Sequence, residues 1–305
     1  SEISNFDMMV EVQGPNMREF IRGLGVDFRP SNTELGVFAL TMAASGNMAD
    51  VSLKNIVGTA GPTKFTGTGE FTDFGATPEQ GPKSAFDFTL VLDDVPVVDF
   101  MEATAEVPEE EDWGNWSKEP MELAVLNEYD GRVNVTANNI VYDKYSFENP
   151  RFEAVLKDGT ITINNFTGKL FGGDVAIAGS FSSLGELDMD MSIKNAAIVD
   201  ATNSFAGINP ITGYFDMTQK ITGKGTSQET LVSSLNGTGA VTASPGTING
   251  INIPELSERI NSLSNQNGIL GLLSSTLSGG QTPYDGGSST LTTKNGFIQH
   301  AWREQ

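Results

Sequence analysis

An internal repeat is the feature that most constrains this chain. The segment ADVSLKNIVGTAGPTKFTGTGEFTDFG at residues 49–75 is echoed by GTITINNFTGKLFGGDVAIAGSFSSLG at residues 159–185, with Asn55 matching Asn165. Each copy continues into a second matching block, at residues 86–101 and 187–202. Duplicated segments of short alternating strands indicate an elongated β-structure rather than a single globular catalytic domain.

Apolar and polar residues alternate within both copies. Residues 86–92 and 187–193 place an apolar side chain at every second position, and residues 133–137 continue the pattern. A period of two gives a strand one apolar face and one wet face, which is typical of antiparallel sheets. Turn dipeptides such as Asp158-Gly159 and Asn236-Gly237 separate the runs.

Alternation alone leaves the architecture open. An apolar strand face packs on a second sheet in most β-proteins, so the pattern by itself favours a sandwich or a β-solenoid core over an open, curved sheet. Two short helices are predicted. One lies near residues 15–23, after Pro15, and the other near residues 254–277, after Pro254.

The repeat also predicts how the chain is divided. Residues 1–104 form a first β repeat unit and residues 121–225 a second one. Between them, residues 105–120 are an acidic linker rich in Pro and Trp, with Trp113 and Trp116 expected to pin it down. Residues 226–305 form a closing unit that contains the second predicted helix.

Composition excludes several classes of protein. The chain has 39 acidic and 18 basic residues and a formal net charge of −21, so nucleic acid is excluded as a partner. There is no Cys, hence no disulfide framework and no thiol chemistry. No apolar run is long enough for a membrane helix. The first residues lack the order of a signal peptide. We expect a fragment of a longer protein, with any membrane anchor outside it.

The search for catalytic and metal-binding groups predicts no enzyme, no cofactor and no metal. His300 is the only histidine and is expected on the surface, so a Ser-His-Asp arrangement would depend on it alone. Asp188 and Asp190 share one strand face and could serve glycoside chemistry or calcium, as could Asp93 and Asp94. The favoured interpretation is that these carboxylates, and the acidic run at residues 109–112, are solvated.

Several motifs together resemble the AsmA-like family of bacterial envelope proteins. The first is VQGPNMREFIRGLGVDF, a strand followed by Gly-Pro, a short helix and a Gly-containing exit. The second is FEAVLKDGTITINNFTGKLFGGDVAIAGSFSS, and the third is LNGTGAVTASPGTINGINIPEL, with KNGFIQ closing the chain. The resemblance covers most of the chain and is strongest from about Asp130 onward. The first copy departs from it, because GTAGPTKF stands where the second has GKLFGGDV.

The resemblance implies a long twisted antiparallel sheet, curled into an open trough or β-solenoid-like groove with an apolar inner face. It also implies a periplasmic location, an inner-membrane anchor outside this chain, and a role in phospholipid transfer and outer-membrane biogenesis. Phospholipid acyl chains would be the ligands, and inner- and outer-membrane proteins the partners. The side chains expected to line the groove are Phe86, Phe88, Leu90, Leu92, Val133, Val135, Ile161, Ile163, Val175, Ile177, Leu187, Met189, Met191, Ile193 and Met217.

Two other functions stay open at this point. One is a non-catalytic structural or assembly module of the cell envelope, with a closed and filled β core. The other is a polysaccharide-acting enzyme on a β-solenoid, which needs carboxylates that converge in a cleft. The cross-section of the sheet separates the lipid groove from the assembly module: the groove needs an open, lined sheet, and the module a closed and filled one.

Overall fold

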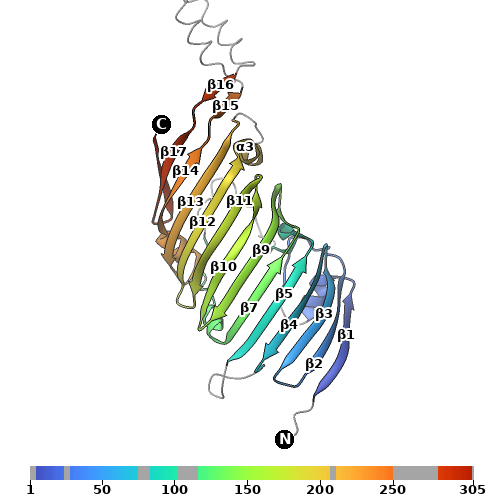
Figure 1. The fold of residues 1–305 in the computed structure, drawn as a ribbon. Helices are drawn as coiled ribbons and strands as arrows, with labels where there is room; N and C mark the ends of the chain where they lie inside the picture. Colours follow the sequence, from blue (N-terminus) through green and yellow to red (C-terminus); the bar gives the residue numbers. More distant parts are fainter. Residues whose placement is uncertain are drawn as a thin grey trace, which may run out of the picture.

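The chain folds into one long, twisted β-sheet (Figure 1). A computed structural model describes residues 5–23, 28–74, 83–101, 116–206, 211–249 and 281–303. Sixteen strands form the main sheet, and β15 and β16 form a separate two-stranded sheet. The main hydrogen-bonded path starts at β1 and ends at β18 without closing on itself. The prediction of a mainly β, open sheet is therefore confirmed.

The strands of the first half of the sheet are β1 (Phe6–Gly14), β2 (Phe38–Gly46), β3 (Val51–Ala60), β4 (Thr63–Thr72), β5 (Ser84–Leu92), β6 (Asp94–Pro96), β7 (Tyr129–Thr136), β8 (Asn139–Tyr142) and β9 (Tyr145–Lys157). Those of the second half are β10 (Thr160–Leu170), β11 (Gly173–Ser182), β12 (Glu186–Ala197), β13 (Tyr214–Lys224), β14 (Asn236–Ala243), β15 (Gly246–Asn249), β16 (Gln281–Tyr284), β17 (Gly287–Lys294) and β18 (Phe297–Arg303).

Helices are few and short in the described part of the chain. The helix predicted near residues 15–23 is α1 (Met17–Gly23), whereas the one predicted near residues 254–277 lies outside the described residues. Three further helices, α2 (Val97–Phe100), α3 (Ile198–Ala206) and α4 (Gln228–Ser234), and the 3-10 helix η1 (Leu123–Asn127) were not predicted. Ser227 caps α4 by accepting a hydrogen bond from the Thr230 N–H.

The sheet is mixed rather than purely antiparallel. β5 runs parallel to β7, and the small strand β6 runs parallel to β8. Every other pair is antiparallel. A parallel pair needs a crossover at least as long as a strand, and the chain between β5 and β7 provides it. Residues 116–121 of this crossover lie against α4, where Met121 N–H donates to the Thr226 carbonyl at 2.7 Å. Trp116 is exposed there, contrary to the prediction that it anchors the linker, and Trp113 lies outside the described residues.

The sequence repeat is also a repeat of three-dimensional structure. β3, β4 and β5 of the first copy match β10, β11 and β12 of the second. Each copy has an irregularity at the same place, between Leu53 and Ile56 in the first and between Ile163 and Phe166 in the second. A bulge at a shared position increases strand twist in the same way twice, so the two copies bend alike.

The described sheet is a single layer. Strand contacts run along the hydrogen-bonded neighbours, and no second sheet packs on the main one within the described ranges. The sandwich favoured by alternation alone is thus wrong for this part of the chain. Only a few apolar side chains are buried there: Leu35, Ala44, Ile56, Ala154, Val175 and Ala196. One sheet includes strands from all three predicted β units.

Candidate apolar groove

One face of the main sheet collects the apolar side chains. Directly paired residues on neighbouring strands lie on the same face, so the strand registers can be followed from one side of the sheet to the other. Phe88 pairs with Val133, Val133 with Ala154, and Ala154 with Ile163. From β10 onward, Ile177 pairs with Met191. All fifteen predicted lining residues fall on this face, which we call the apolar face.

The apolar face is more protected than the opposite, polar face. Ile163 is half-buried, whereas its neighbours Thr162 and Asn164 are exposed. Met189 is likewise half-buried between exposed Asp188 and Asp190. No second sheet covers the face within the described ranges, so among these residues the protection comes from neighbouring side chains and from the bending of the sheet.

Aromatic rings give part of that lateral protection in the first half of the sheet. The Phe71 ring lies 5.3 Å from the Phe88 ring and 5.4 Å from the Phe74 ring in edge-to-face geometry. Further along, the Phe166 ring lies 5.1 Å from that of Phe147 and 5.9 Å from that of Phe152. Such pairs shield one another from water while leaving the space above them free.

Short helices border the apolar face near both ends of the sheet. The Phe20 ring of α1 stacks on the Phe38 ring at 4.3 Å, and Phe38 belongs to this face by its register. At the other end, Leu235, which directly follows α4, lies over Gly223 of β13. The strands thus form the base of the apolar face, and α1 and the residue after α4 partly border it near the two ends of the sheet.

A polar pair, Gln219 and Thr293, interrupts the apolar face. Gln219 of β13 pairs with Met191 and is only 7% exposed. Its Nε2 donates to Thr293 Oγ1 at 3.0 Å, while its Oε1 has no hydrogen-bond partner. The side-chain oxygen lies over Gly239. A buried amide oxygen without a partner costs about 1–3 kcal/mol. The sequence pattern placed Gln219 in the apolar phase but gave no sign of this bond.

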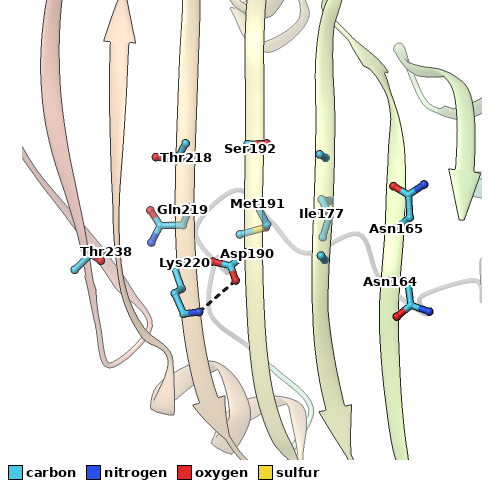
Figure 2. Close-up of a pocket in the computed structure, with 12 residues that line it drawn as sticks. Asn164, Asn165, Ile177, Asp190, Met191, Ser192, Thr218, Gln219, Lys220 and Thr238 are labelled. Atoms are coloured by element: carbon cyan, nitrogen blue, oxygen red, sulfur yellow. Dashed lines mark hydrogen bonds and ion pairs between the residues drawn. The ribbon is translucent and has the colours of Figure 1, made fainter. Parts of the chain in front are cut away.

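The hollow in Figure 2 lies mainly on the polar face and is therefore not the predicted groove. Small side chains such as Ala176 and Ala178 line it together with Asp190, Thr218 and Lys220. The dashed line in Figure 2 joins Lys220 Nζ to Asp190 Oδ2 at 3.2 Å. It is an open depression with paired charges, which suits solvent rather than a hydrocarbon chain.

The four aspartates considered as candidate catalytic or calcium-binding groups form ion pairs or hydrogen bonds with nearby residues. Lys220 contacts both Asp188 and Asp190, and the hydrogen bond to Asp190 is the main cause that raises the pKa of the Lys220 ammonium. Asp188 and Asp190 lie exposed on the polar face, as the favoured interpretation predicted. Asp93 accepts a hydrogen bond from the Lys64 N–H at 2.7 Å, and Asp94 one from Asn139 Nδ2 at 2.7 Å.

A second set of paired charges lies where β7 meets β9. Lys157 Nζ donates to Asp130 Oδ2 at 2.9 Å, and Lys83 Nζ lies 3.8 Å from Asp130 Oδ1. The hydrogen bond from Lys157 is the largest cause that lowers the pKa of the Asp130 carboxyl, against the opposing effect of burial. These carboxylates hold strands together on the polar face.

Other kinds of site are not found in the part of the chain that the structure describes. Within it, no three His, Cys, Asp or Glu side chains gather as they would around a metal ion. No helix in the same ranges has the length and apolar character needed to cross a membrane. The acidic run at residues 109–112 and the side chain of His300 lie outside what is described.

An open, single-layer sheet with one largely apolar face characterises the described part of the chain. The sequence model of the AsmA family matches residues 10–301, nearly the whole chain, and the chain belongs to that family. Neither a curated protein nor a solved structure matches it. Family membership supports a role associated with the cell envelope.

Proposed function

We propose that this chain provides an apolar groove that carries phospholipid acyl chains between the inner and outer membranes. The observation that carries the proposal is the apolar face itself. Fifteen side chains from nonadjacent parts of the sequence share one face of an unclosed sheet, with no second sheet upon it in the described ranges. A protein that needed this surface only for its own folding would cover it with a second layer.

The size of the hydrophobic effect explains why such a groove would be useful. Exposing a methylene group to water costs about 0.8 kcal/mol, so a sixteen-carbon chain faces a barrier of about 12 kcal/mol. An apolar surface that follows the chain removes most of this cost, while the headgroup stays in water at the open side. No catalytic group, metal or cofactor is needed, and we propose none.

Substitutions on the two faces of the same strands test the proposal. Phe88→Asp and Ile163→Asp each add a charge to the apolar face, and we expect a loss of bound phospholipid of at least about tenfold, since a buried unpaired charge is strongly disfavoured. The matched controls are Thr89→Asp and Thr162→Asp, one residue away on the exposed face. Native mass spectrometry of delipidated protein, incubated with palmitoyl-oleoyl phosphatidylcholine vesicles, counts the bound lipid.

The outcomes separate the alternatives. Loss of lipid in the apolar-face variants, with the controls unchanged and all four proteins folded by circular dichroism, supports the groove. If the unaltered protein binds no phospholipid, or if both sets of variants bind equally, the groove does not function in this way. Periplasmic location, and contact with inner- and outer-membrane proteins, belong to the same proposal and rest on family membership.

A second candidate is an assembly module that contacts other envelope proteins. The observation that favours it is a set of exposed apolar side chains in or directly after hairpin turns at one end of the strands: Met48 (84% exposed), Leu184 (64%) and Phe297 (75%). Exposed apolar turns of this kind suit a protein partner. Replacing all three with Ser would leave lipid binding intact and abolish capture of the partner if this role is the correct one.

A further inference from the structure

Two glycines of the apolar face lie beneath aromatic rings of the neighbouring strand. Gly69 of β4 pairs with Phe88, and a methyl group added at Gly69 would lie 2.5 Å from Cε1 of the Phe88 ring. Gly131 of β7 pairs with Phe86, and a methyl group there would lie 2.4 Å from Cε2 of the Phe86 ring. Both rings therefore lie flat over a neighbouring strand, one on each side of β5.

The backbone does not require glycine at either position. Neither Gly69 nor Gly131 has a positive φ, so any residue could adopt the local conformation. For both glycines, the three atoms nearest to an added methyl group all belong to the ring. The absence of a side chain there serves the ring, because any larger residue would lift it away from the sheet.

The second copy of the repeat shares one half of this arrangement, with a different side chain over the glycine. Leu187 and Met189 stand in place of Phe86 and Phe88, and they pair with Gly223 and Gly179. The Met189 sulfur lies 2.6 Å from the position of a methyl group on Gly179. Gly69 and Gly179 thus hold the same place in the two copies, and each lies beneath a large side chain of the next strand, whereas Gly223 lies beneath Leu235.

The location of the rings gives the arrangement a consequence. β5 is the last strand of the first copy, and its parallel partner β7 begins the next unit. A hydrocarbon chain that moves along the sheet has to pass over β4, β5 and β7. If Phe86 and Phe88 stood upright, the rings would obstruct the groove at this junction.

We propose that Gly69 and Gly131 determine how thick a hydrocarbon chain can pass this junction, because they keep the Phe86 and Phe88 rings flat. The ligand class is an unbranched acyl chain, which is thinner than a methyl-branched one. This inference rests on the proposed lipid function and adds to it a selection among chains. The glycines act through the rings and are positioning residues.

The test compares two lipids on the full chain. Vesicles of palmitoyl-oleoyl phosphatidylcholine supply straight chains, and vesicles of diphytanoyl phosphatidylcholine supply methyl-branched chains. The quantity measured is the ratio of the two lipids bound to delipidated protein. We expect the unaltered protein to prefer the straight-chain lipid and Gly69→Ala/Gly131→Ala to lose about tenfold in binding of both lipids, since overpacking forces the rings out of place. Adding Phe86→Leu and Phe88→Leu to that variant should restore binding.

A second variant keeps the test decisive if the alanine variant fails to fold. Phe86→Leu/Phe88→Leu in the natural background introduces no clash and should bring the ratio of the two lipids close to one. The matched control is Gly23→Ala, where a methyl group meets no heavy atom within 4 Å. A leucine variant with an unchanged ratio would overturn the inference while straight-chain binding still upheld the groove. Absence of any lipid on the unaltered protein would overturn the groove itself.

Discussion

The two copies of the repeat share their geometry but differ in what they place on it. Each has the same strand irregularity, at Leu53 to Ile56 and at Ile163 to Phe166. Phe71 of the first copy contacts two further rings, whereas its counterpart Phe181 has no ring contact recorded among the described residues. On the apolar face, β4 and β5 of the first copy thus carry a ring cluster, whereas β11 and β12 of the second carry mainly aliphatic side chains and methionines. The ring cluster of the second copy lies at β10, where Phe166 meets Phe147 and Phe152.

This difference shows which features the architecture depends on. Bulge position and glycine position stay the same between the copies, whereas the identity of the apolar side chains changes. The backbone features set twist and depth, and the apolar side chains only need to fill the space. Methionine in the second copy can fill irregular space, because its side chain has three rotatable bonds. Phenylalanine in the first copy is more rigid.

The largest expected effect is the loss of an aromatic cluster. Phe71→Ala should lower the free energy of unfolding by about 3 kcal/mol. Phe181→Ala should cost about 1–2 kcal/mol less than Phe71→Ala, because it loses burial without two aromatic contacts. Urea denaturation followed by circular dichroism measures both. Equal losses would contradict the claim that the rings distinguish the two copies.

A smaller effect is expected at the polar interruption of the second copy. Gln219 stands opposite Met191, whereas the equivalent position in the first copy is Val135, opposite Leu90. Thr293→Val removes the hydrogen-bond partner of the buried amide and should cost about 1–2 kcal/mol.

The double variant Gln219→Met/Thr293→Val serves as the control. It makes the second copy resemble the first, because no buried polar atom is left over from the pair. Its free energy of unfolding should return to about the original value or exceed it. A double variant as unstable as Thr293→Val alone would contradict this explanation. The instability would then not come from the unpaired amide of Gln219.

The smallest effects concern ion pairs on the polar face. The pKa of Asp130 is lowered chiefly by Lys157, so its contribution to stability is present above the unfolded value near 3.8 and is lost as the pH falls below it. Asp130→Asn should reduce the loss of unfolding free energy at acidic pH by less than about 1 kcal/mol. The pKa of Lys220 is raised by Asp190, so its contribution is lost only as the pH rises above 10.5. Thermal unfolding across pH checks both signs.

Much of the apolar face could be predicted from alternation alone. A period of two places Phe86 and Phe88, or Met189 and Met191, on one face whatever the neighbouring strands are, because side chains in a strand point alternately to either side. The repeat extends this to both copies. Whether that face is covered depends on contacts between distant segments, and for this reason the same pattern also predicted a sandwich.

Other features left no readable pattern. Strand direction does not alter side-chain alternation, so the parallel pairing of β5 with β7 could not be distinguished from an antiparallel one. The helix α2 spans only Val97–Phe100, which is too short for a helical period to appear. Gly69 and Gly131 look like ordinary glycines in the sequence, and only the register reveals the rings above them.

The parallel junction has a consequence for how such a sheet can grow. The chain up to the end of the first repeat copy contributes five strands to the main path, β1 to β5, and the chain from there to the end of the second copy also contributes five, β7 and β9 to β12. A stretch with an odd number of alternating strands begins and ends in the same direction. Two such stretches that start in the same direction therefore meet as a parallel pair of strands, as β5 and β7 do. Each duplication of this kind needs a connection that travels back along a whole strand. The strand that follows the second copy avoids this requirement, since β13 pairs antiparallel with β12.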